Sequence, residues 1–117
     1  MESIVKEKSY KFAVRMVKLY QHLNVEKREY VMSKQIVRSA TSIGANVREA
    51  LQGQSKADFT AKMSIALKEA SETEYWLELL RDTGYLSESA YNSIQKDCAE
   101  IAKMLTSIVK TSRKKIL

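Results

Sequence analysis

The sequence predicts an all-α fold, an antiparallel up-down-up-down four-helix bundle, from three observations. The 117 residues include no proline and only three glycines, so few positions interrupt a helix. Four stretches carry apolar residues three and four positions apart, the spacing of one helix face. The links between these stretches are short, which favours antiparallel neighbours. We therefore expect residues 1–117 to form one domain without a linker or an internal repeat.

The first two helices are expected over residues 3–22 and 26–52. The apolar stripe of the first helix consists of Phe12, Met16, Leu19 and Leu23. The apolar face of the second helix consists of Val37, Ala40, Gly44, Val47 and Leu51. Gly53 follows the second stretch and is expected to cap it in the left-handed backbone conformation.

The third helix is expected over residues 55–83. Ser55 and Asp58 resemble a capping box at its start, and Gly84 is expected to cap its end. The apolar seam of this helix consists of Phe59, Met63, Ala66, Ala70, Leu77 and Leu80.

The fourth helix is expected over residues 87–112, with Ser87 at its N-terminal cap. Its seam has the spacing of coiled-coil packing and consists of Tyr91, Ile94, Cys98, Ile101, Leu105 and Ile108. Residues 113–117 are expected to form a basic tail that frays.

Gly44 is an unusual residue for a helix, because an internal glycine costs about 1 kcal/mol relative to alanine. It lies one turn from Ala40, and Ala66 and Ala70 have the same spacing on the third helix. Small residues that face each other let two backbones approach closely. We interpret Gly44 as a close contact between the second and third helices. The alternative is a close approach by a second subunit or a ligand.

Polar residues follow one side of the second helix at spacings of four, four and three: Arg38, Ser42, Asn46 and Glu49. Asn46 is flanked by apolar residues and is expected to be partly buried and hydrogen-bonded to the third helix or to a neighbouring subunit. Glu69, Glu72 and Thr73 of the third helix are possible partners. Arg38 is likewise expected to be at least partly buried, as half of a structural ion pair.

The net charge of +6 is unevenly distributed. Residues 1–23 and 87–117 each carry +3, whereas residues 55–86 carry −2. Because the first and fourth helices of such a bundle are neighbours, their cations should form one surface that contacts nucleic-acid phosphates. A solvated surface without a ligand is the alternative. The candidate binding residues are Lys11, Arg15, Lys18, Lys96, Lys103, Lys110, Arg113, Lys114 and Lys115.

No catalytic, metal or cofactor site is indicated, and we expect a protein that is not an enzyme. His22 is the only histidine and lies at a helix end. Cys98 lies on an apolar seam, where an inert buried thiol is expected. Glu69 and Glu72 lack the histidine of a di-iron motif. No apolar run has the length of a membrane span or of a secretory leader, so we expect a cytoplasmic protein.

The stretch QIVRSATSIGANVREAL is similar to a motif of small four-helix bundle proteins encoded in intervening sequences of bacterial 23S rRNA genes. The matching positions are Arg38, Ser42, Ile43, Gly44, Ala45, Asn46, Val47 and Glu49. A second block, IALKEASETEYWLELLRDTGYL, resembles the third helix of that family at Glu72, Leu77, Gly84 and Tyr85. It departs from the family at Lys68 and Glu69, where many members carry Gly-Ser.

The resemblance implies four-helix bundles that assemble into homopentameric rings. A related protein of diversity-generating retroelements is a basic pentamer that accompanies a reverse transcriptase and binds nucleic acid. Two functions remain open: a homo-oligomer that binds structured RNA or DNA, and an assembly adaptor for a polymerase-type protein. Independently of the resemblance, some apolar residues outside the seams should contact another copy, with Trp76 the clearest case. They are Val14, Tyr20, Ile36, Ile65, Trp76 and Leu79.

Overall fold

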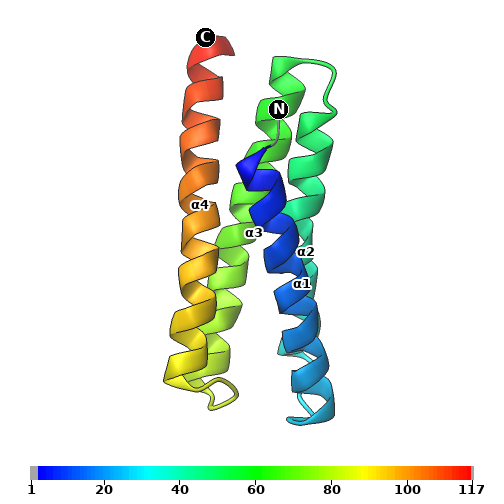
Figure 1. Cartoon of the computed structure of the whole chain (residues 1–117), viewed down its shortest axis with the longest axis vertical. Helices are drawn as coiled ribbons and strands as arrows, with labels where there is room; N and C mark the ends of the chain where they lie inside the picture. Colours follow the sequence, from blue (N-terminus) through cyan, green and yellow to red (C-terminus); the bar gives the residue numbers. More distant parts are fainter. Residues whose placement is uncertain (1–2, 117) are drawn as a thin grey trace.

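The structure, a computed structural model, describes residues 3–116, with side chains described as far as Lys114. This part of the chain contains four α-helices and no strand: α1 (Ile4–Val25), α2 (Met32–Leu51), α3 (Lys56–Asp82) and α4 (Glu88–Ile116) (Figure 1). The helices form an elongated body of 47 × 24 × 20 Å. The prediction of an all-α fold with four helices is confirmed.

Successive helices lie side by side, and each runs opposite to the one before it in Figure 1. Contacts between α2 and α3 occur in reversed order, since Arg38 pairs with Glu72 and the later Glu49 pairs with the earlier Lys62. The α2 helix packs against α1 and α3, and α3 also packs against α4, whereas α1 and α4 meet over a small area. The start of α1, the end of α4 and the α2–α3 turn lie toward one end of the molecule, here called the terminal end (Figure 1).

One apolar core runs through the bundle, and the predicted seams supply most of it. The buried seam residues are Phe12, Met16 and Leu23 of α1, Met63, Ala66, Ala70, Leu77 and Leu80 of α3, and Ile94, Cys98, Ile101 and Leu105 of α4. Two hydroxyl pairs also link neighbouring helices inside the bundle. Ser39 and Thr73 lie 2.9 Å apart between α2 and α3, and Thr60 meets Ser112 between α3 and α4. The apolar pattern gave no signal for these buried polar residues.

The predicted face of α2 is offset from the buried one. Ala40 and Val47 are buried as expected, but Leu51 is 44% exposed. Ile36, which was predicted to contact another subunit, is fully buried together with Ile43. Because α2 has a neighbour on each side, its buried arc is wide, and the predicted stripe followed only one edge of that arc.

The α2 helix begins at Met32, later than the predicted residue 26. The Glu29 side chain accepts hydrogen bonds from the backbone N–H groups of Val31, Met32 and Ser33 at 3.1, 3.0 and 2.7 Å. It thereby satisfies donors that the first helical turn leaves unpaired. Arg28, just before it, has a φ of 53°, which is not helical. The segment that the prediction assigned to the start of α2 is therefore a loop.

The caps of α3 are as predicted. Ser55 Oγ accepts a hydrogen bond from the Asp58 N–H at 3.1 Å. At the other end, Gly84 has a φ of 85°, and the Tyr85 N–H donates to the Leu80 carbonyl at 2.8 Å. This bond and the left-handed glycine form a Schellman motif, which pairs carbonyls that the last turn leaves free.

Three other helix ends differ from the prediction. The α1 helix continues to Val25, and α4 continues through Ile116, so residues 113–116 extend the helix. Gly53 is not a left-handed cap, because Gly84 is the only glycine with positive φ in residues 3–116. The reason for a glycine at position 53 is space, since an added Cβ would lie 3.0 Å from the Ala50 carbonyl oxygen.

Candidate functional site

The second half of α4 is the most basic surface segment of the chain. Residues 101–117 contain five cations and no aspartate or glutamate. Four of the cations are exposed and make no ion pair within the described part of the chain: Lys103, Lys110, Arg113 and Lys114. We call these four residues the α4 strip. The side chain of Lys115, predicted for the same surface, lies outside the described residues.

The α1 cations predicted for this surface are partly engaged with carboxylates. Arg15 Nη1 lies 2.7 Å from Asp97 Oδ2 of α4, and Arg15 Nη2 donates to Ser93 Oγ at 2.8 Å. Lys11 Nζ lies 3.2 Å from Glu7 Oε1 on its own helix. Two further predicted cations are exposed and form no ion pair with any described residue, Lys18 and Lys96. Arg15 thus serves the α1–α4 contact. Of the six predicted cations that form no ion pair with described residues, five lie on α4.

Further cations line surface grooves beside α1. A groove of about 630 Å³ between α1 and α2 is lined in part by Lys6, Tyr10, Lys11, Arg48 and Leu51. Lys11 also lines a groove of about 180 Å³ between α1 and α4, which contains Glu100. Glu100 and Lys103 lie together on an open face of α4. The α1–α2 groove therefore shares Lys11 with the α1–α4 groove, which in turn shares Glu100 with the face of α4 that carries Lys103.

Lys6 and Arg48 were not among the predicted binding residues. Each is an ordinary exposed cation on an amphipathic helix, and they are far apart in the chain. Only the packing of α1 against α2 brings them to the same groove. No local sequence signal could have identified this pair.

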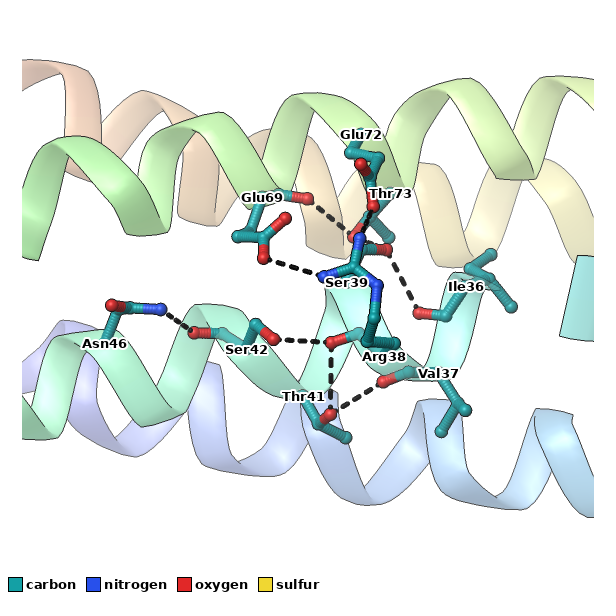
Figure 2. Close-up of polar contacts among 10 residues, drawn as sticks. All are labelled: Ile36, Val37, Arg38, Ser39, Thr41, Ser42, Asn46, Glu69, Glu72 and Thr73. Carbon is teal, nitrogen blue, oxygen red and sulfur yellow. Dashed lines mark hydrogen bonds and ion pairs between the residues drawn. The ribbon is translucent and has the colours of Figure 1, made fainter. Parts of the chain in front are cut away.

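Arg38 of α2 lies opposite two carboxylates of α3 (Figure 2). Its Nη1 lies 3.2 Å from Glu69 Oε2, and its Nη2 contacts Glu72 Oε2. The Arg38 side chain is 51% exposed, whereas that of Glu69 is 16% exposed. The predicted ion pair is present with both candidate partners, but Arg38 is not buried. Together with the nearby hydroxyl pair of Ser39 and Thr73, it connects α2 to α3 (Figure 2).

Ser42 and Asn46 bond within α2 rather than to α3 (Figure 2). Ser42 Oγ donates to the Arg38 carbonyl at 2.7 Å, and Asn46 Nδ2 donates to the Ser42 carbonyl at 2.8 Å. Asn46 is half-buried as predicted, but its amide is satisfied one turn back along its own helix. Glu49 makes the link to α3 instead, with its Oε1 3.1 Å from Lys62 Nζ.

Gly44 faces α1. A Cβ added to Gly44 would lie 3.4 Å from the carbonyl oxygen of Ser9 and 3.5 Å from its Oγ. The expected close helix contact exists, but the expected partners, Ala66 and Ala70 of α3, were wrong. Gly44 lies on the edge of α2 that the α1 backbone approaches.

Trp76 is half-buried against the core, and its ring meets Tyr75 edge-on with 5.1 Å between centroids. Its Nε1 is buried and has no hydrogen-bond partner among residues 3–114. The other off-seam apolar residues divide into two groups. Val14 and Ile65 are exposed, and Tyr20 and Leu79 are half-buried.

The single cysteine is unsuited to nucleophilic chemistry. Cys98 is buried, and burial raises the pKa of its thiol to about 12, so the thiol stays protonated at neutral pH. Its Sγ lies 3.7 Å from the Ala70 carbonyl oxygen. His22 is exposed in the last turn of α1. Within the described chain, no three potential metal-binding side chains of the His, Cys, Asp and Glu types come together.

The fold and the α4 strip define a small, basic, all-helical bundle protein. Nowhere in the described residues is a helix long and apolar enough to cross a membrane. A family model described as 23S rRNA-intervening sequence protein matches residues 1–107, and the chain belongs to that family. This confirms the resemblance found in the sequence.

A crystal structure from Bacteroides thetaiotaomicron is similar to this chain at 62% sequence identity and a TM-score of 0.90. The match covers 92% of this chain and 99% of the other. That structure is described as a protein with unknown function from the S23 ribosomal protein family. No curated protein matches the chain.

Proposed function

We propose that this protein is a non-enzymatic, basic homo-oligomer that binds structured RNA or DNA through backbone phosphates. The α4 strip is the observation that carries the proposal. Its four exposed cations follow one helix, and no carboxylate occurs in the sequence after Glu100. Rows of lysine and arginine at this density bind the phosphate backbone without reading base sequence.

Stabilisation of the helix end does not account for the whole α4 strip. The C-terminal end of a helix is partially negative, so cations in its last turn stabilise it by about 0.3–1 kcal/mol. Arg113 and Lys114 fit that role. Lys103 and Lys110 lie more than one turn before Ile116, beyond the reach of this effect. Neither forms an ion pair with a described residue, and Glu100, one turn before Lys103, is paired with Lys8, so their exposure favours an external polyanion.

Exposed apolar side chains support the oligomeric part of the proposal. Val14 and Val17 form an exposed apolar pair on α1, and Ile65 and Tyr75 are exposed on α3. The α3 region is acidic, whereas the terminal helices are basic, so unlike surfaces can meet head to tail and close a ring. Family membership and the up-down-up-down arrangement of the helices (Figure 1) favour the five-subunit ring expected from the resemblance.

Fluorescence anisotropy with a labelled hairpin RNA and a labelled DNA duplex tests the proposal. The wild-type protein should bind both, and the logarithm of the association constant should fall linearly with the logarithm of salt concentration. The double variant Lys103→Glu, Lys110→Glu should bind at least about tenfold more weakly and show a smaller salt slope.

A matched control variant changes the net charge by the same amount as the double variant of the α4 strip. Lys27 and Lys34 are exposed, lie toward the end opposite the terminal end and form no ion pair with described residues. The variant Lys27→Glu, Lys34→Glu should stay within about twofold of wild type, since only nearby charges act strongly at moderate salt. No binding by the wild type at about 50 mM salt would contradict the proposal and favour a protein adaptor.

A further inference from the structure

Tyr10 stands in the α1–α2 groove at the terminal end. Its side chain is 55% exposed, and Arg48 of α2 lies over its ring, with Cζ 5.2 Å from the centroid. A guanidinium over an aromatic face is attracted by the ring quadrupole, which favours one ring orientation. The groove has a volume of about 630 Å³, within the range of small-ligand sites.

The lining of this groove combines stacking and charge. Lys6, Lys11 and Arg48 border Tyr10, and Glu7 is the one acidic residue of the lining. Glu7 is itself paired with Lys11 at 3.2 Å, so the groove keeps a net positive charge. Cations beside an exposed aromatic ring are the combination with which proteins bind single-stranded nucleic acid.

We infer that the α1–α2 groove at the terminal end binds an unpaired nucleotide, with the base stacked on the face of Tyr10 opposite Arg48 and the neighbouring phosphates on Lys6, Lys11 and Arg48. The inference rests on the proposed function and narrows its ligand to nucleic acid with a single-stranded loop or end. Lys11 also borders the α1–α4 groove, whose carboxylates Asp97 and Glu100 are paired with Arg15 and Lys8. Lys103 follows Glu100 on α4, so the flanking backbone can continue toward the α4 strip.

Two other tyrosines have the same exposure and lack this setting. Tyr30 lies in the α1–α2 loop, away from the terminal end, and Tyr75 lies on the acidic α3 region; both are 55% exposed. Neither has a guanidinium over its ring among the described residues. Tyr30 is the better control, because Tyr75 also contacts Trp76.

Three probes of equal length separate stacking from charge: a labelled oligothymidylate of about 20 nucleotides, an abasic strand with the same backbone, and a duplex. The wild type should bind the oligothymidylate more tightly than the abasic strand. Tyr10→Leu should weaken oligothymidylate binding about tenfold and leave the abasic strand and the duplex within about twofold. Tyr10→Phe keeps the aromatic face, so it should bind like the wild type, as should Tyr30→Leu.

Equal affinity of the wild type for the oligothymidylate and the abasic strand would overturn the inference and leave the proposed function in place. An unchanged oligothymidylate affinity in Tyr10→Leu would overturn it as well. A change of sedimentation in Tyr10→Leu would also overturn it, by assigning Tyr10 to a contact between subunits. Failure of the wild type to bind any probe would remove the proposed function, and the inference with it.

Discussion

At Gly44 the amount of space decides which side chains α2 accepts. The nearest atoms to an added Cβ lie at 3.4–3.5 Å, which is ordinary contact, so alanine fits. Gly44→Ala should raise the free energy of unfolding by up to about 1 kcal/mol through helix propensity. Gly44→Leu should lower it by about 1–3 kcal/mol, because the longer side chain meets the Ser9 backbone. Urea denaturation followed by circular dichroism measures both changes.

The control for Gly44 is its neighbour Ala45, which is exposed on the same helix. Ala45→Leu should change the free energy of unfolding by less than about 0.5 kcal/mol. If Gly44→Leu were equally harmless, the α1 backbone would not approach α2 at this position.

Arg38 illustrates an exposed ion-pair network with a modest energy. Arg38→Ala should lower the free energy of unfolding by about 1 kcal/mol, because it leaves Glu69 and Glu72 without their shared cation. The loss should shrink as salt concentration rises. Arg38→Lys should recover part of it, since an ammonium keeps the charge without the planar fork. Unchanged stability together with weaker nucleic-acid binding would instead assign Arg38 to the binding surface.

Cys98 should be chemically silent in the folded protein. Its pKa of about 12 leaves almost no thiolate at pH 8, and the side chain is buried. Raising the pH from about 7 to about 9 stays below that pKa, so the rate at which a thiol reagent modifies Cys98 should remain low. A thiol reagent such as dithionitrobenzoate should modify Cys98 only after denaturant is added. Rapid and complete modification of the folded protein would contradict the buried position.

At the scale of the helix, the start of α2 depends on Glu29. Its carboxylate accepts three backbone N–H bonds and is 7% exposed. Glu29→Ala should lower the free energy of unfolding by about 1–2 kcal/mol. Glu29→Gln should cost less, because the amide oxygen still accepts hydrogen bonds. Chemical denaturation measures both variants, with Glu26→Ala, an exposed residue of the same link, as the control. Equal stability of all three variants would show that the cap is dispensable.

The four helices and their approximate positions could be predicted from the sequence, because the apolar spacing, Ser55 and Gly84 are local signals. The start of α2 could not be predicted, because Glu29 is not among the residues usual at a helix cap, although all its capping bonds are local. The partner of Gly44 could not be predicted either. Because α2 packs against both α1 and α3, the spacing of its small residues does not show which neighbour Gly44 faces. Spacing shows that a face is buried, whereas the choice of neighbour is made by the packing of the whole bundle.

At the scale of the whole molecule, the candidate site is only partly visible in the sequence. The α4 strip could be predicted, because its residues belong to one helix and share a face. The contributions of Lys6 and Arg48 could not, because their proximity arises from two separate helices. Arg15 was predicted to contact phosphates, but the sequence did not show that its guanidinium would pair with Asp97.

The last prediction concerns assembly. The exposed valines and isoleucine of α1 and α3 are poorly placed for a monomer, because burying them against a second copy removes apolar surface from water. Sedimentation equilibrium at micromolar concentration should therefore give a mass several times the chain mass of 13.4 kDa, and the five-subunit ring predicts five times that mass. Ile65→Glu should dissociate the assembly, whereas Val31→Glu, at an exposed position in the α1–α2 link, should leave it intact. A stable wild-type monomer would remove the ring, and it would also weaken the nucleic-acid proposal, because one copy lacks the repeated strips that let several weak phosphate contacts act together.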